Sequence, residues 1–234
     1  MTYNIRHASP PSQPNTINVD TIVGIISKYQ PDLVALQEVD VHTKRSGEAL
    51  DEAKAIGQKT GMYSFFVKAI NYQGGEYGIA ILSKNPIVDS VGLALPMNEG
   101  SGGEPRAIAI ATVVLKNGQK LKFACTHLEL KAENRMLQVQ KIKELFAGEK
   151  LPVILSGDFN DTPGSETINF VDGFFQRSCT QDCSYSFPET NPEKLIDFIF
   201  FTPKKFSVKS HQVIVETFAS DHRPVMAELM YHSK

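Results

Sequence analysis

The chain lacks several features that would mark it as a membrane, nucleic-acid or zinc-binding protein. It has no tryptophan, only three cysteines, and no apolar run approaching the roughly 18–20 residues that span a bilayer, so we expect no transmembrane segment. Its 24 basic and 26 acidic residues give a formal net charge of −2. Proteins that hold nucleic acid mainly through its phosphates usually carry a basic excess. Nucleic acid is therefore permitted as a partner but is not indicated by charge.

The few cysteines divide into two kinds. Cys125 lies in the apolar run 121–125 and is expected to be a small buried core residue. Cys179 and Cys183 lie four residues apart in a loop-like stretch, where they could form a local disulfide if the protein is exported. Zinc is disfavoured because no second Cys/His pair of suitable spacing accompanies them.

The N-terminus leaves the localisation open. Residues 1–5 have the pattern of the middle of a strand and contain no signal peptide. One hypothesis is that an N-terminal segment was removed, together with an export signal.

With 234 residues, of which 41% are hydrophobic, the chain is long enough for one large domain. We find no repeat or linker, and predict a single domain over residues 1–234 that is monomeric. Strands outnumber helices and several are joined as hairpins, the clearest at Asn117-Gly118, which favours a mixed, largely antiparallel arrangement with helices outside. The predicted helices cover residues 18–30, 49–60, 133–147 and 165–171, and the predicted strands cover residues 2–6, 32–39, 63–70, 77–83, 106–115, 120–128, 151–155, 196–201, 207–215 and 225–230.

The most informative stretch is Gly157-Asp158-Phe159-Asn160, which follows the apolar run 151–155. An Asp and an Asn two residues apart at the end of a strand lie on the same side of the chain, where ligands of layered α/β proteins tend to bind. A carboxylate there can transfer a proton or hold a metal, and an amide can orient a phosphate without adding charge. The alternative is a strand-ending Asx turn.

Further polar residues lie at the ends of apolar strands. Each has a structural alternative, such as a turn or a satisfied core histidine. Burying so many acids, amides and imidazoles is costly unless they pair with one another or bind metal. The set comprises Asn4, Glu38, His127, Asp158, Asn160, Asp197, Asp221 and His222.

These residues lie within motifs that together resemble the endonuclease/exonuclease/phosphatase superfamily of metal-dependent phosphohydrolases. The resemblance implies an α+β fold, a four-layer α/β/β/α sandwich of two mixed sheets flanked by helices (DNase I-like). The motifs follow the family's order over nearly the whole chain. They are Tyr3-Asn4-Ile5-Arg6, Leu36-Gln37-Glu38-Val39, Tyr77-Gly78-Ile79-Ala80, Thr126-His127-Leu128, Gly157-Asp158-Phe159-Asn160, Ile196-Asp197-Phe198-Ile199 and Ser220-Asp221-His222-Arg223-Pro224.

The resemblance also implies roles for single residues. Glu38 would be the principal ligand of Mg²⁺ or Mn²⁺, with Asn4 nearby, because oxygen ligands suit these ions. Asp221 would hold either His222 or a second metal. The remaining catalytic roles are His222 on the attacking water or the phosphate, Asp197 orienting His222, Asp158 activating the nucleophile, Asn160 positioning a phosphate oxygen, and His127 contacting the phosphate or protonating the leaving group.

Three further positions are predicted to bind substrate on weaker grounds. Arg106 could clamp a phosphate, although an exposed strand-end arginine is the alternative. Arg45 follows Glu38 in a loop, where a solvated charge pair is the favoured alternative. Tyr77 belongs to one of the motifs above.

The function these residues predict is hydrolysis of a phosphate ester with Mg²⁺ or Mn²⁺ as cofactor, favouring a phosphodiesterase on a small molecule or lipid headgroup. Nuclease members of the family generally add basic surface or inserted loops, which this chain does not clearly show. A DNA or RNA endonuclease is nevertheless the first alternative. A binding protein that kept the fold and lost activity is the second.

Overall fold

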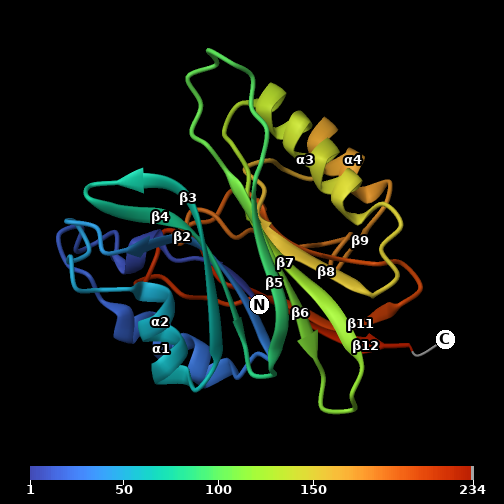
Figure 1. Ribbon diagram of the computed structural model, residues 1–234, viewed down its shortest axis with the longest axis horizontal. Coiled ribbons are helices and arrows are strands. Elements are labelled where there is room, and N and C mark those ends of the chain that lie inside the picture. Colours follow the sequence, from blue (N-terminus) through green and yellow to red (C-terminus); the bar gives the residue numbers. More distant parts are fainter. Residues whose placement is uncertain (233–234) are drawn as a thin grey trace.

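The computed structural model describes residues 1–232, which form two six-stranded sheets packed face to face, with helices on both outer sides (Figure 1). The first sheet has the strand order β11-β12-β1-β2-β4-β3 and the second β5-β6-β7-β8-β10-β9. Helices α1 and α2 cover the first sheet, and α3 and α4 cover the second (Figure 1). The predicted four-layer DNase I-like sandwich is thus confirmed.

The bounds of the elements are as follows. The first sheet comprises β1 (Thr2–Asn4), β2 (Leu33–Val41), β3 (Tyr63–Tyr72), β4 (Gly75–Ser83), β11 (Phe206–Val213) and β12 (Val225–Tyr231). The second comprises β5 (Ile87–Ala94), β6 (Ala107–Val114), β7 (Lys120–His127), β8 (Val153–Asp158), β9 (Gln176–Arg177) and β10 (Asp197–Phe201). The helices are the 3₁₀ turn η1 (Arg6–Ala8), α1 (Val19–Tyr29), α2 (Glu52–Thr60), α3 (Ala132–Phe146) and α4 (Glu166–Asp172).

Alternation along the strands divides the apolar residues into three layers. In β2, Leu36 packs toward α1 and α2, whereas its neighbour Ala35 packs between the two sheets. The second sheet repeats this pattern, because Phe123 packs between the sheets and Ala124 packs toward α3 and α4. Successive strand residues point to opposite faces, so a strand buried on both sides reads as a continuous apolar run.

The sequence missed two strands and misplaced one helix start. Strand β5 is an edge strand whose residues are mostly exposed, so its sequence lacks the apolar pattern that indicates a buried strand. Strand β9 has only two residues. Helix α2 begins at Glu52 rather than near residue 49, because the Asp51 side chain accepts a hydrogen bond from Lys54 N and so caps the helix there.

The structure forms the Cys179–Cys183 disulfide that the spacing predicted, and Cys125 is a free, buried core cysteine. Among the described residues, no helix is long and apolar enough to cross a membrane.

A cavity of about 510 Å³ opens between the sheets near the start of β1, at the end of the sandwich remote from the polar strand ends. Apolar side chains such as Phe123, Ile154 and Met226 contribute much of its lining. None of the polar residues selected from the sequence lies in it, so the site is defined by convergent side chains and not by this cavity.

Candidate active site

Strand register brings three of the predicted residues to one edge of the second sheet. Strand β8 runs parallel to β7, which places His127 beside Asp158, and antiparallel to β10, which places Asp197 on the other side of Asp158. Gly157 permits the close approach of β7, because a Cβ atom at this position would lie 2.0 Å from the Thr126 carbonyl oxygen. The glycine of the Gly-Asp-Phe-Asn motif is therefore required by packing.

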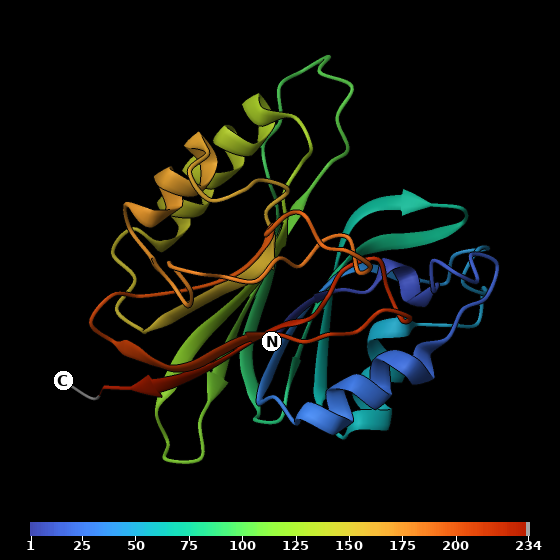
Figure 2. The same ribbon diagram turned by 180° about the vertical axis from the view of Figure 1, so that it is seen from behind.

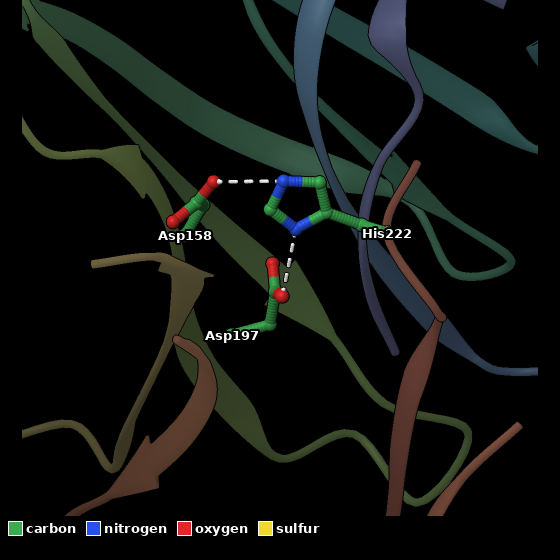
Figure 3. A group of neighbouring side chains, drawn as sticks. All are labelled: Asp158, Asp197 and His222. Atoms are coloured by element: carbon green, nitrogen blue, oxygen red, sulfur yellow. Dashed lines mark hydrogen bonds and ion pairs between the residues drawn. The ribbon is translucent and has the colours of Figure 1, made fainter. Parts of the chain in front are cut away.

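The imidazole of His222 lies between the carboxylates of Asp197 and Asp158 (Figure 3). Its Nδ1 is 2.9 Å from Asp197 Oδ2 and its Nε2 is 3.7 Å from Asp158 Oδ2. Because the two ring nitrogens face opposite ways, this arrangement is a carboxylate–imidazole–carboxylate relay. The three side chains are close enough together to hold a metal ion, but the Asp197–His222 hydrogen bond already uses one nitrogen. A relay accounts for the geometry better than a metal site.

Electrostatics favour a charged His222. Burial alone would lower its pKa, but the carboxylates of Asp197 and Asp158 outweigh burial and raise the pKa of His222 to about 10. Burial, followed by the nearby charge of Asp197, raises the pKa of Asp158. Asp158 is thus a weaker acid than a solvated aspartate.

His127 has the opposite character at the same degree of burial. Its Nδ1 lies 3.2 Å from Arg106 Nη1, and its Nε2 lies 3.5 Å from Asp158 Oδ2. Burial, then the positive charges of Arg106 and His222, hold the pKa of His127 well below its ordinary value. His127 is therefore a neutral ring beside a cationic one.

In the first sheet, Asn4 at the end of β1 lies between two carboxylates of the site. The side-chain nitrogen of Asn4 donates to Glu38 Oε1 at 2.9 Å and to Asp158 Oδ2 at 3.0 Å, so Asn4 bridges the two carboxylates. Its oxygen accepts a hydrogen bond from Arg6 N and is not turned toward Glu38. Asn4 is thus beside Glu38 as predicted, but the atom it presents is a hydrogen-bond donor and not a metal ligand.

Glu38 has the environment expected of an oxygen ligand for a divalent cation. It lies at a bulge of β2, with φ of 57°, which turns its carboxylate out of the regular ladder. Burial, and less strongly the charge of Asp221, raise the pKa of Glu38, while Asn4 opposes them. No ion-pair partner of Glu38 is found among residues 1–232. A carboxylate that is partly buried, near another acid and without an ion-pair partner in the described residues fits a bound Mg²⁺ or Mn²⁺, with Glu38 and Asp221 as the residues that would hold it.

Asp221 does not hydrogen-bond to His222, because Asp197 has that role. It is half-buried and lies 3.6 Å from the Arg6 guanidinium. Of the two predicted roles for Asp221, the structure excludes the first in this form and leaves metal binding as a proposal.

The chain between β1 and α1 is strained next to the site. The three residues of η1, Arg6, His7 and Ala8, all have φ between 44° and 50°. Non-glycine residues rarely adopt this left-handed conformation, which costs about 1–2 kcal/mol per residue. The turn directs Arg6 toward Asp221, so the strain lies where it fixes the edge of the site.

The structure corrects the predictions for two arginines. Arg45 is not a solvated charge pair: its guanidinium binds both oxygens of the fully buried Asp40 at 2.7 and 2.9 Å and lies over the rings of Tyr72 and Tyr77. Arg106 is not an exposed strand-end arginine, because it is only 6% exposed and pairs with Glu104 at 2.7 Å. Tyr77 is buried beside both arginines.

Asn160 follows Asp158 in the left-handed region, with φ of 50°. Its backbone N–H donates to Asp158 Oδ1 and its side-chain nitrogen donates to the Leu128 carbonyl. Asn160 therefore closes the turn that the structural alternative predicted. Its amide oxygen has no hydrogen bond within residues 1–232, and its contact with a phosphate stays a prediction.

Sequence reasoning missed three residues that support the relay. The Ser186 hydroxyl donates to Asp197 Oδ2 at 2.6 Å, and the Phe187 ring lies 4.8 Å from the His222 ring between centroids. The Ser220 hydroxyl donates to the Asn4 carbonyl at 2.7 Å and ties the Asp221-His222 segment to β1. Ser186 and Phe187 lie in an irregular segment, so no periodicity could have revealed them. Ser220 stands in the Ser-Asp-His motif, which was the available signal.

Comparison with known proteins agrees with this description. The fold is shared with solved structures, among them three that are less than 25% identical to this chain. An endonuclease/exonuclease/phosphatase protein from Beutenbergia cavernae is 22% identical, with a TM-score of 0.80 over 98% of this chain and 70% of that one. A mannosyl-6-phosphatase from Bacteroides thetaiotaomicron is also 22% identical, with a TM-score of 0.77 over 98% of both chains. The human Nocturnin catalytic domain, solved with sulfate, is 20% identical, with a TM-score of 0.72 over 92% of this chain and 86% of that one.

The fold is the DNase I-like fold of phosphoesterases. The sequence model of the endonuclease/exonuclease/phosphatase family matches residues 1–222, and the chain belongs to this family. Members of the family are phosphohydrolases or nucleases and generally depend on a divalent metal. No curated protein sequence matches the chain.

Proposed function

We propose that the protein is a Mg²⁺- or Mn²⁺-dependent phosphodiesterase acting on a small-molecule or lipid-headgroup phosphodiester. The observation that carries the proposal is the Asp197–His222–Asp158 relay, which lies beside the oxygen ligands Glu38 and Asp221. It places a cationic donor directly beside a buried carboxylate, and phosphoester hydrolysis uses both kinds of group.

Each residue has a part in this chemistry. Asp158 takes the proton of the attacking water, since its raised pKa makes it a suitable base near neutral pH. Protonated His222, held by Asp197, donates to a phosphate oxygen on which negative charge develops. His127 donates to the leaving oxygen or the phosphate, and the Asn160 amide helps to orient the phosphate. A cation held by Glu38 and Asp221 would add positive charge that stabilises the phosphate in the transition state.

The paired arginines support a diester over a monoester or a nucleic acid. Arg6, Arg45 and Arg106 are each opposed by a carboxylate, namely Asp221, Asp40 and Glu104. A phosphomonoester carries nearly two negative charges and a nucleic acid carries a row of them, and both demand free positive charge. A single phosphodiester group carries one negative charge, so it suits a site in which these three arginines are each paired with a carboxylate.

The test is an activity panel in Mg²⁺ and in Mn²⁺ over bis-p-nitrophenyl phosphate, p-nitrophenyl phosphate, plasmid DNA, RNA and sphingomyelin. We expect the diester to be hydrolysed faster than the monoester, with activity lost in EDTA. Asp197→Asn protein purified in parallel controls for contaminating nucleases. Preferential cleavage of DNA or RNA would replace the proposal with the nuclease alternative. No turnover of any phosphoester would favour a binding protein.

A further inference from the structure

Arg106 lies against the face of the site that the relay does not use. It immediately precedes β6, and its Nη1 lies 3.2 Å from His127 Nδ1 and 2.7 Å from Glu104 Oε1. The arginine is buried, and its Nε has no hydrogen-bond partner in residues 1–232. Burying a charged group is costly, so we expect this contact to stabilise both the arginine and the histidine.

The chemistry of the two groups fixes where the imidazole proton lies. Arginine has five N–H donors, no acceptor, and does not lose its charge in proteins. A hydrogen bond between Arg106 and His127 Nδ1 therefore requires Nδ1 to be the acceptor, without a proton. A neutral ring with a bare Nδ1 carries its single proton on Nε2.

The Nε2 side of His127 faces the site. Its nearest charged partner is Asp158 Oδ2, and the 3.5 Å separation is too long for a strong hydrogen bond. The Nε2–H of His127 points toward Asp158 without a strong hydrogen bond to it. This N–H is therefore available to donate to a substrate oxygen beside Asp158.

We propose that Arg106 is a positioning residue for His127, which holds the ring neutral with its proton on Nε2 so that this N–H can donate to the substrate. The inference rests on the proposed phosphoester hydrolysis for its catalytic meaning. It revises the phosphate-clamp role predicted from the sequence. Arg106 acts through the histidine, and Glu104 holds the same guanidinium nitrogen, Nη1, that contacts the ring.

Three substitutions separate the possible contributions of Arg106. Arg106→Lys keeps a charged side chain that can only donate, and should preserve the tautomer if the ammonium reaches Nδ1. Arg106→Gln offers both a donor and an acceptor and thus permits either tautomer, while Arg106→Met offers neither. Glu104→Gln is the matched control, because it removes the ion pair of Arg106 without touching His127.

The decisive readout is the tautomer itself. Metal-free protein labelled with ¹⁵N-histidine is measured by long-range ¹H–¹⁵N correlation, with the His127 signals assigned from a His127→Gln variant. We expect the Nε2–H form in the wild type, Arg106→Lys and Glu104→Gln. Arg106→Gln and Arg106→Met should show a measurable fraction of the Nδ1–H form. With bis-p-nitrophenyl phosphate, these two variants should lose about tenfold or more in kcat, up to the roughly 10²–10⁴-fold of a lost acid–base group, with KM little changed.

Several outcomes would overturn the proposal. These are an Nδ1–H ring in the wild type, an unchanged tautomer in both Arg106→Gln and Arg106→Met, or a rise in KM at unchanged kcat, which would mark Arg106 as a substrate clamp. Thermal unfolding checks that each variant folds. If Arg106→Met does not fold, the wild type and the lysine and glutamine variants still decide the question. A wild-type enzyme without phosphoester turnover would remove the proposed function, whereas the tautomer would still show whether Arg106 positions the ring.

Discussion

The His222 side and the His127 side of the site are alike in burial and opposite in charge. Both rings are 5% exposed, and both face the same oxygen of Asp158, from 3.7 and 3.5 Å. His222 has Asp197 on its second nitrogen and is protonated, whereas His127 has Arg106 there and is neutral.

The difference teaches that the residue beside Nδ1 determines the charge of each ring, and thereby the kind of donor that Nε2 presents to the site. Burial lowers the pKa of both histidines, so burial alone would make both neutral. A carboxylate reverses that effect for His222, and a guanidinium reinforces it for His127. One site thereby holds a cationic donor and a neutral donor on either side of a single carboxylate.

The largest effect is expected from removing the cationic side. His222→Ala should lower kcat by about 10²–10⁴-fold with little change in KM, because the cationic donor to the phosphate is lost. The measurement is steady-state kinetics on bis-p-nitrophenyl phosphate with saturating Mg²⁺. Near-normal turnover would show that the Ser-Asp-His match is misleading.

A double-mutant cycle sharpens this prediction. Asp197→Asn should lose much of the same factor, since Asp197 holds His222 through a 2.9 Å contact. The combined variant should be far less than additive, because the two residues act as one unit. Full additivity would mean that the carboxylate and the imidazole work separately.

Removing the proposed cation ligand should have the next largest effect. Glu38→Gln keeps the shape of the side chain and loses its charge, so Mg²⁺ affinity and turnover should fall together. The loss should be at least the roughly 10–100-fold seen when a metal's outer partner is removed. Titration of activity with Mg²⁺ measures both quantities, and the melting temperature in EDTA should match the wild type. Normal activity at the metal concentration that suffices for the wild type would exclude Glu38 as the ligand.

The asymmetry between the histidines is also where sequence reasoning stopped. The sequence correctly predicted the sandwich, because strands buried on both faces leave apolar runs such as those in β2, β7 and β8. It selected His127, Asp158, Asp197 and His222 because polar residues at the ends of such runs are unusual. The structure brings all four together.

The partners of those residues could not be predicted in the same way. Arg106 and Arg45 were both predicted to bind substrate, with an exposed arginine and a solvated charge pair as the alternatives, because a sequence does not show which acid lies opposite a given base. Glu104 and Asp40, which neutralise them, are close in sequence but unremarkable there. Ser186 lies in an irregular loop, where no repeating pattern exposes a buried hydroxyl. Charge states depend on such contacts, so they became visible only in three dimensions.

A smaller loss in kcat is expected when Asp197 still contacts His222 but no longer accepts a hydrogen bond from Ser186. Ser186→Ala deletes the hydroxyl that donates to Asp197 Oδ2 at 2.6 Å. A hydrogen bond to a charged group contributes about 1.5–3 kcal/mol, and we expect the lower end of this range, which corresponds to a loss of about tenfold in kcat. Ser156→Ala is the matched control, because it removes another buried hydroxyl, in the neighbouring β8, that has no hydrogen-bond partner in the part of the chain described. Equal losses in the two variants would mean that Ser186 matters only for packing.

The smallest effect concerns stability and tests the two charge states directly. The folded-state pKa of His127 lies below its unfolded value near 6.5, so its contribution to stability is present above that pH and is lost as the pH falls. His222 is the reverse: its folded-state pKa of about 10 gives a contribution that is complete below pH 6.5 and is lost as the pH rises toward 10. Each slope is at most about 1.4 kcal/mol per pH unit, or about 3–6 °C in melting temperature. Metal-free wild type, His127→Gln and His222→Gln are melted at pH 5.5, 6.5 and 8.5. Relative to the wild type, His127→Gln should lose less stability between pH 6.5 and 5.5, and His222→Gln should lose less between pH 6.5 and 8.5. If His127→Gln loses as much on acidification as the wild type, His127 does not resist protonation, and the contrast between the two sides of the site fails.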